Sequence, residues 1–274
     1  MKQLKLSVQE HMIPGDSIQE KFDLAVHIGY DAIELRGKGE FGFKARLAEL
    51  HAAKKAGVIM NAVCPDMHHF FGDFDAKKRL EGIDNIKSQL SVAAQLGVSG
   101  VITPASWGMF SRRLPPFVPP RSPEEDREVL LEGLRQMGEH AKQEGVVVYL
   151  EPINRYENHM ICTIDQALEL IEAAGLSSIK VCADAYHMNI EEVDMNAALK
   201  RAGTRLGLVH SCDSNRLPAG SGHIDWQGLL QTLHDMDYDG YVTAEGALSG
   251  DPIVALKQGT AYLRGLWQKV AESE

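Results

Sequence analysis

Residues 146–151 read VVVYLE, a short run of β-branched and aromatic residues that stops at Glu151. Three similar runs follow along the chain: KVCAD at 180–184, LGLVH at 206–210 and YVTAE at 241–245. Each run ends in a side chain that can bind a metal ion, and consecutive ends lie 33, 26 and 35 residues apart. Each interval has room for one helix and one strand, which together form the repeating unit of a parallel sheet. The repeat therefore predicts four neighbouring parallel strands in this half of the chain.

The rest of the chain continues the pattern. The eight predicted strands cover residues 4–8, 31–35, 58–63, 98–103, 146–151, 179–184, 205–210 and 240–245. Helical patterns, with apolar residues three and four apart, cover 18–28, 75–96, 124–143, 164–174, 226–235 and 252–270. Eight strand–helix units in 274 residues fit a closed (β/α)8 TIM barrel of the α/β class. A doubly wound sheet is the alternative, but it needs a glycine-rich turn after its first strand, where this chain reads QEHMIPG.

Residues 1–274 are expected to form a single TIM-barrel domain, because no linker or low-complexity stretch interrupts the pattern. The exception is a Pro-rich loop at about 111–122, which contains RRLPPFVPPR at 112–121. Its four prolines exclude a regular helix or a central strand. The loop follows the fourth strand on the face where barrel enzymes carry their active-site loops. It is interpreted as a lid, a surface excursion or a subunit contact.

Composition limits the partners of the chain. The 28 Lys and Arg residues against 38 Asp and Glu residues give a net charge of −10, which disfavours nucleic acid and anionic membrane surfaces. The start of the chain lacks the apolar run of a signal peptide, and nothing approaches the roughly 18 apolar residues of a membrane span. The four cysteines form no C-x-x-C pair and are interpreted as small buried residues in strands. We therefore expect a soluble cytoplasmic protein.

Glu151, Asp184, His210 and Glu245 are the candidate metal ligands. In a closed parallel barrel the ends of successive strands meet at one rim, where such folds carry their active sites. Three acids gathered there would repel one another unless a cation neutralised them. Three oxygen donors and one nitrogen, without a thiolate, favour Mn²⁺ first, or Mg²⁺ or Co²⁺, over a closed structural zinc site. The sequence predicts a catalytic site with one divalent ion.

Other polar residues are expected to lie in the loops above the same rim. Glu157, His187 and Arg216 lie on three successive loops after strands, which favours contact with a substrate. Trp107, just past the fourth strand, fits either a core ring or a platform beside a sugar.

The first half of the chain contributes further candidate positions to the rim. Glu34 and Arg36, at the end of the second strand, are expected to form an ion pair with each other. His68 and His69, just after the third strand, fit either the pocket or solvent.

Three segments resemble a known family. EPINRYE at 151–157, DAYHMNIEE at 184–192 and NRLP at 215–218, with the glycines and the Asp-Trp pair that follow, are similar to ketose 3-epimerases of the D-tagatose and D-allulose (psicose) kind. That family belongs to the xylose isomerase-like TIM barrel superfamily. The likeness is specific over 146–245 and architectural before it, and the chain departs from the family pattern at 244–247, which read AEGA.

The resemblance implies a site and an assembly. It implies that Glu151, Asp184, His210 and Glu245 bind one divalent ion. It also implies that Glu157, His187 and Arg216 contact the hydroxyls and carbonyl of a substrate, and that the protein forms a homo-oligomer, either a dimer or a tetramer.

The chemistry of such a site is enolisation of a sugar. An ion that holds two adjacent oxygens of a free ketose stabilises a cis-enediolate. If Glu151 and Glu245 approach the reacting carbon from opposite faces, one removes a proton and the other returns one, which epimerises C3. If one base serves both carbons, the same site performs aldose–ketose isomerisation. The sequence predicts an isomerase of carbohydrate metabolism with a small-molecule sugar substrate.

Three alternatives remain open at the level of sequence. A keto-sugar or keto-inositol lyase or dehydratase would use the same metal site. A non-catalytic sugar-binding barrel would need no metal. An abasic-site endonuclease is disfavoured, because it needs a histidine after the fourth strand, where residues 102–108 read ITPASWG, and because the chain is acidic.

Overall fold

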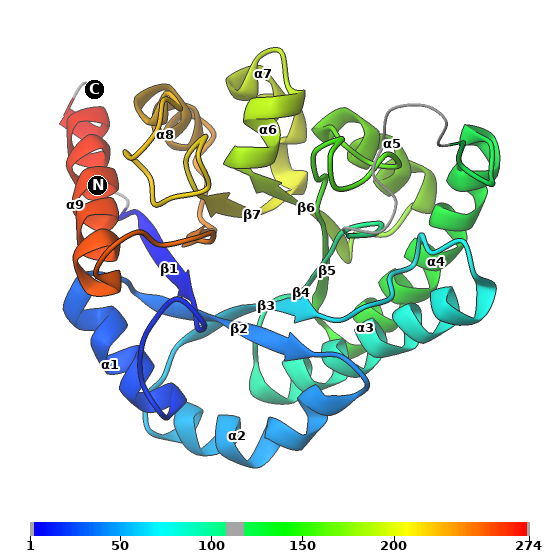
Figure 1. The fold of residues 1–274 in the computed structure, drawn as a ribbon, viewed down its shortest axis with the longest axis horizontal. Coiled ribbons are helices and arrows are strands. Elements are labelled where there is room, and N and C mark those ends of the chain that lie inside the picture. The colour runs from blue at the N-terminus through cyan, green and yellow to red at the C-terminus, as the bar shows by residue number, and fades with distance from the viewer. Residues whose placement is uncertain (1–2, 108–117, 273–274) are drawn as a thin grey trace.

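Eight parallel strands close into a barrel that a ring of helices surrounds in the computed structural model, which describes residues 3–107 and 118–272 (Figure 1). Each strand pairs with the next in the chain, and β1 pairs with β8 to close the sheet. The predicted (β/α)8 TIM barrel is therefore confirmed. The strands are β1 (Lys5–Gln9), β2 (Ala32–Lys38), β3 (Met60–Asp66), β4 (Gly100–Thr103), β5 (Val147–Leu150), β6 (Ile179–Asp184), β7 (Leu206–Ser211) and β8 (Tyr241–Ala244).

Helices cover the outer face of the barrel, and α9 returns to lie beside α1 and α8 (Figure 1). The α-helices are α1 (Ile18–Ile28), α2 (Leu47–Lys55), α3 (Ala76–Leu96), α4 (Pro123–Glu144), α5 (Ile164–Ala174), α6 (Ala185–Glu191), α7 (Met195–Ala202), α8 (Trp226–Asp235) and α9 (Pro252–Glu272). Short 3₁₀ turns are η1 (Gly42–Arg46) and η2 (Gly203–Arg205). The start of α4 shows how sequence sets these bounds, since Ser122 and Glu125 form a capping box around Pro123 at the first helical position.

β2 and β3 differ most from the prediction. Both run past the expected ends, at 35 and 63, and pair with each other as far as Lys38 and Asp66. Gly37 permits this extension, because a Cβ there would collide with the Gln89 side-chain oxygen on α3. The sequence ELRGK at 34–38 hid the extension of β2, because it is neither apolar nor alternating.

The interior of the barrel has its own apolar cluster, separate from the large core between strands and helices. Its members alternate along the strands with residues of the outer core, so they point inward. They are Ala62, Cys64, Ile102, Tyr149, Cys182 and Leu208. Residues two positions further along β5, β6 and β7 point the same way and lie one layer closer to the carboxyl ends of the strands. Those residues are Glu151, Asp184 and His210.

The Pro-rich loop expected at 111–122 lies largely outside the described residues. Its described end is anchored by Arg121, whose Nε donates to Asp126 Oδ1 at 2.6 Å and whose Nη atoms donate to the carbonyls of Gly72 and Asp73. Within residues 3–107 and 118–272, no helix is long and apolar enough to cross a bilayer.

Candidate active site

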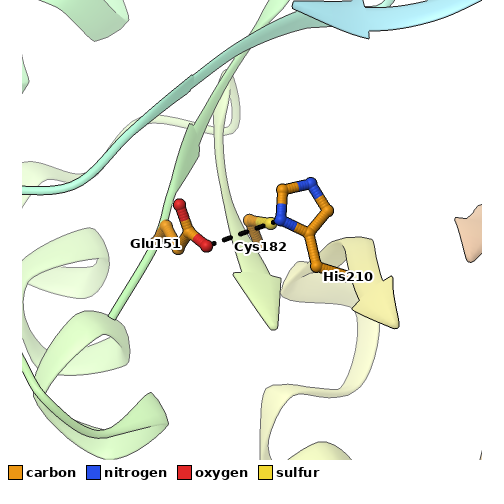
Figure 2. A group of neighbouring side chains, drawn as sticks. All are labelled: Glu151, Cys182 and His210. Carbon is orange, nitrogen blue, oxygen red and sulfur yellow. Dashed lines mark ion pairs between the residues drawn. The ribbon is translucent and has the colours of Figure 1, made fainter. Parts of the chain in front are cut away.

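The four predicted ligands come together at the carboxyl end of the barrel. Asp184 and His210 are directly paired in the β6–β7 register, and Glu151 and Glu245 follow the last residues of β5 and β8. One ligand atom from each lies within 4.8 Å of the ligand atoms of the other three. His210 Nδ1 is at the centre, 2.5 Å from Glu245 Oε2, 3.5 Å from Glu151 Oε1 and 3.9 Å from Asp184 Oδ2. The contact between Glu151 and His210 is drawn in Figure 2.

Two atoms at the centre of this cluster lack a hydrogen bond. His210 Nδ1 and Glu245 Oε2 are both buried, and neither has a hydrogen-bond partner in the described part of the chain, although they lie 2.5 Å apart. Buried polar atoms are rarely left in this state without an unseen water or ion. A nitrogen and a carboxylate oxygen that face the same point, with two more carboxylates beside them, fit a divalent cation that prefers oxygen and imidazole ligands.

Asp184 serves the fold and the cluster with different oxygens. Its Oδ1 accepts a 2.9 Å hydrogen bond from the His187 N–H and thereby caps α6. Its Oδ2 faces His210 instead. An acid at a strand end can therefore be a helix cap and a candidate ligand at once.

Cys182 lies against the cluster, which the sequence had not indicated. Its sulfur groups with Glu151 and His210 (Figure 2). Burial raises the pKa of the Cys182 thiol far above neutrality, so it is present as a neutral thiol rather than as a thiolate. The four cysteines form no disulfide with one another. The expectation that they sit buried in strands is wrong for Cys162, which is half-buried in the loop before α5, and for Cys212, which is buried but lies just past β7.

The acids of the cluster differ in their electrostatics. Burial raises the pKa of the carboxyl groups of Glu151 and Asp184 above their ordinary values. Burial also acts to raise the pKa of Glu245, but His210 and Arg216 outweigh it and hold that pKa below its ordinary value. A cation shared by the three acids would compensate the buried charge of Glu151 and Asp184.

This electrostatic pattern predicts how pH controls metal binding. A metal ion binds the deprotonated acids, so protons compete with it as the pH falls toward the raised pKa values of Glu151 and Asp184. Burial acts to lower the pKa of His210, but the neighbouring charges outweigh it and hold that pKa above its ordinary value, so His210 also releases a proton to the metal. The apparent affinity for Mn²⁺ should therefore fall as the pH falls, by up to about tenfold per pH unit for each proton displaced. Calorimetric titrations across this range, with proton release measured in two buffers, check this. An Mn²⁺ affinity that stays unchanged down to about pH 4.3, the ordinary pKa of a glutamate side chain, would contradict the prediction.

A cavity of about 380 Å³ opens above the cluster. Glu151 and Glu245 line it, whereas Asp184 and His210 lie almost fully buried beneath. Its lining also includes His187, Arg216 and Trp107. Trp107 is 58% exposed, so it is a wall of the cavity and not a core residue.

Arg216 is held by a strained backbone. Its φ of 65° lies in the left-handed region, which is uncommon for a side chain of this size. The guanidinium lies 4.6 Å from the centre of the Tyr186 ring, and its Nη1 is 3.2 Å from His187 Nε2. Ala247 N–H donates to the Arg216 carbonyl at 2.8 Å, and a Cβ at Gly246 would lie 2.5 Å from that same oxygen. These contacts hold Arg216 over the cavity in spite of the strain.

Glu157 stands at the edge of the cavity and is not part of its lining. It accepts a 2.8 Å hydrogen bond from Trp107 Nε1 and a 3.2 Å one from Asn154 Nδ2. Asn154 also donates its backbone N–H to His187 Nδ1 at 3.1 Å. Glu157 is thus joined through its partners to the residues that face the cavity.

The loop that carries Arg216 is organised by Asp213, which is fully buried. Its Oδ2 accepts from Gly220 N–H at 2.8 Å and from Trp226 Nε1 at 3.0 Å, and its Oδ1 accepts from Ile224 N–H at 3.1 Å.

Replacing Asp213 by asparagine should destabilise the protein. An amide nitrogen would face donors that need an acceptor, and two unsatisfied donors cost about 3 kcal/mol together. The free energy of unfolding, measured by urea denaturation, tests this. A variant as stable as the wild type would contradict it.

Sequence reasoning misplaced one pair. Glu34 does not pair with Arg36: its carboxylate contacts Gln9 and His210, and Arg36 donates to Cys64 Sγ at 3.1 Å and lies 3.7 Å from Asp66. The two side chains share a face of β2, but they lie in successive layers of the barrel.

Other cavity residues were missed or left open. His11 and Gln9 line the cavity from β1 and the turn after it, and their only sequence signal was their place at a strand end. His68 and His69 do not line this cavity: they border a second one of about 340 Å³, which shares Asp66 and Met67 with the first.

Similarity to known proteins agrees with this geometry. The family described as "Xylose isomerase-like TIM barrel" matches residues 22–266. The chain belongs to this family. It is 37% identical, over 95% of its own length and 99% of the relative, to 3-dehydro-D-guloside 4-epimerase of Escherichia coli strain K12. It is also 29% identical, over 80% of its length and 75% of the relative, to D-psicose 3-epimerase of Agrobacterium fabrum strain C58.

Among solved structures, the apo form of 3-keto-D-glucoside 4-epimerase from E. coli superposes with a TM-score of 0.90. The two are 36% identical, and the match covers 96% of this chain and 100% of the other. These relatives are named epimerases, which are isomerases, so the prediction of an isomerase in this family is confirmed.

Proposed function

We propose that this protein is a metal-dependent epimerase that inverts the carbon beside the ketone of a keto sugar. The observation that carries the proposal is the position of Glu151 and Glu245. Both line one cavity, and both belong to the buried cluster centred on His210 Nδ1. Two acids that face the same substrate from different strands can exchange protons on its opposite faces.

Each residue has a proposed role. Glu151, Asp184, His210 and Glu245 hold one divalent ion, which when bound would polarise the ketone and acidify the neighbouring C–H. One of the two glutamates that line the cavity takes the proton from that carbon, which gives an enediolate, and the other delivers a proton to the opposite face.

The surrounding residues orient the sugar. Arg216 and His187, in contact with each other over the cavity, hydrogen-bond the substrate oxygens. Trp107 forms a wall against the ring, and Glu157 fixes that wall through its hydrogen bond.

A 3-keto glycoside inverted at C4 is the substrate class that we favour. The E. coli relative aligned over 95% of this chain is named for a C4 reaction on a 3-dehydro glycoside. The second cavity, which shares Asp66 and Met67 with the first, offers room for a group attached to the sugar.

C3 epimerisation of a free ketose is the second candidate. The match to D-psicose 3-epimerase over 80% of the chain supports it. Both reactions invert a carbon adjacent to a ketone, so the same residues serve either one.

The ion that we propose is Mn²⁺, with Mg²⁺ or Co²⁺ as alternatives. The donor set of three carboxylates and one imidazole suits these ions. Assembly into a homo-oligomer and a cytoplasmic location stay predictions.

The test is incubation of the protein and Mn²⁺ in D₂O with 3-keto glucosides and with free ketoses. Inversion with deuterium at C4 of the glycosides supports the favoured reaction, and deuterium at C3 of a ketose supports the second candidate. Deuterium at C1 would instead indicate aldose–ketose isomerisation, and an unsaturated product would indicate a lyase. No exchange with any substrate, in protein shown to bind Mn²⁺, would overturn both proposals.

A further inference from the structure

Glu34 lies behind His210, on the side of the imidazole away from the cluster. Both of its carboxylate oxygens are 3.2 Å from His210 Nε2, whereas Glu151, Asp184 and Glu245 face Nδ1. The carboxylate and the imidazole are each fully buried. We propose that Glu34 is a positioning residue that fixes the ring orientation and tautomer of His210. The proposal rests on the metal site of the proposed function.

The hydrogen-bonding capacity of a carboxylate sets the tautomer. Ionised Glu34 can only accept, so the contact at Nε2 requires a proton on that nitrogen. In a neutral imidazole Nδ1 then carries a lone pair, and Nδ1 is the atom left without a hydrogen bond in the cluster. A carboxylate that orients a metal-binding histidine in this way also raises the basicity of the ligand atom.

Gln9 holds the carboxylate in turn. Its Nε2 donates to Glu34 Oε1 at 2.8 Å from the neighbouring strand, where Gln9 and Glu34 are register partners. Gln9 is also fully buried. The chain Gln9–Glu34–His210 therefore runs across the barrel interior from β1 to β7 and ends at the ligand atom.

The first experiment measures Mn²⁺ affinity by calorimetry. Glu34→Gln removes the charge but keeps the size of the side chain, and it should weaken Mn²⁺ binding about 10- to 100-fold. Ser7→Ala is the matched control, because Ser7 lies two residues before Gln9 on β1, is fully buried and bonds to Asn61 instead of to the cluster. It should bind Mn²⁺ as the wild type does.

A double variant separates position from charge. Gln9→Glu with Glu34→Gln restores the number of buried carboxylates but moves the charge from β2 to β1, away from the contact with His210. If Glu34 acts by position, the double variant should stay as weak as the single one. Full recovery of Mn²⁺ affinity would overturn the proposal.

The tautomer gives a readout that does not depend on metal or activity. Nitrogen NMR of the metal-free protein, recorded at a pH at which the His210 ring is neutral, should show the ring protonated at Nε2 in the wild type and in Ser7→Ala, and a changed tautomer population in Glu34→Gln. A neutral wild-type ring protonated at Nδ1 alone would overturn the proposal. Wild-type protein that binds no Mn²⁺ would overturn the proposed function, while the tautomer would still report on Glu34.

Discussion

Glu245→Gln is expected to lower kcat for epimerisation by about 10²- to 10⁴-fold, the range by which a positioned acid–base group accelerates a reaction. Glutamine keeps the size and one oxygen of the side chain, but it cannot accept a proton from carbon. Glu245 lines the cavity, and its pKa lies below its ordinary value, so at neutral pH it is a carboxylate ready to act as a base. The rate should be measured at saturating Mn²⁺, with the bound metal quantified.

Deuterium exchange distinguishes two bases from one. If each face of the substrate has its own base, the Glu245→Gln variant should still exchange deuterium into the epimer whose reacting C–H points toward Glu151. It should not invert the configuration of that carbon. Glu151→Gln should exchange the proton of the other epimer. If both variants lost exchange with the same epimer, one residue would be the base for both faces, and the assignment of opposite faces would be wrong.

Asp184→Ala is expected to have the second large effect, because it removes a proposed ligand and a helix cap together. Mn²⁺ affinity should fall by more than the roughly 100-fold upper range for residues that only support a ligand. The free energy of unfolding should also fall by about 1 kcal/mol through loss of the cap of α6.

Asp184→Asn separates the two losses. Asparagine is an equally good cap, so the metal-free protein should keep nearly wild-type stability while Mn²⁺ affinity still falls. Denaturation without metal and calorimetry with metal measure the two effects independently. If Asp184→Asn bound Mn²⁺ as tightly as the wild type, Asp184 would be a cap alone.

The sequence predicted the barrel and the four converging side chains because both follow from one repeat. Strand ends spaced by one helix and one strand must meet at one rim of a closed parallel sheet. Residues such as Glu151 and His210 can therefore be identified from their positions at strand ends. The helices Ile18–Ile28, Ile164–Ala174 and Trp226–Asp235 were predicted with their observed bounds, because each has a clear apolar stripe and a capping residue.

Contacts across the barrel were not predictable in the same way. Glu34 meets His210, which is 176 positions away, and no local pattern records that meeting. Arg36 is the opposite charge nearest to Glu34 in the sequence, so an ion pair between them was expected. The two side chains lie in successive layers of the barrel interior, and this position in space cannot be seen in the sequence. The helices α2, α6 and α7 were missed because they are only seven to nine residues long, so each offers few repeats of an apolar stripe.

The contact between Gly246 and the Arg216 carbonyl ties the loops after β7 and β8 into a single unit. Any side chain at 246 would push that carbonyl away and displace the guanidinium from its place over the cavity. A substitution in either loop should therefore also shift the other. Grafting only one of them from a relative should yield a folded barrel whose recognition of sugars is lost.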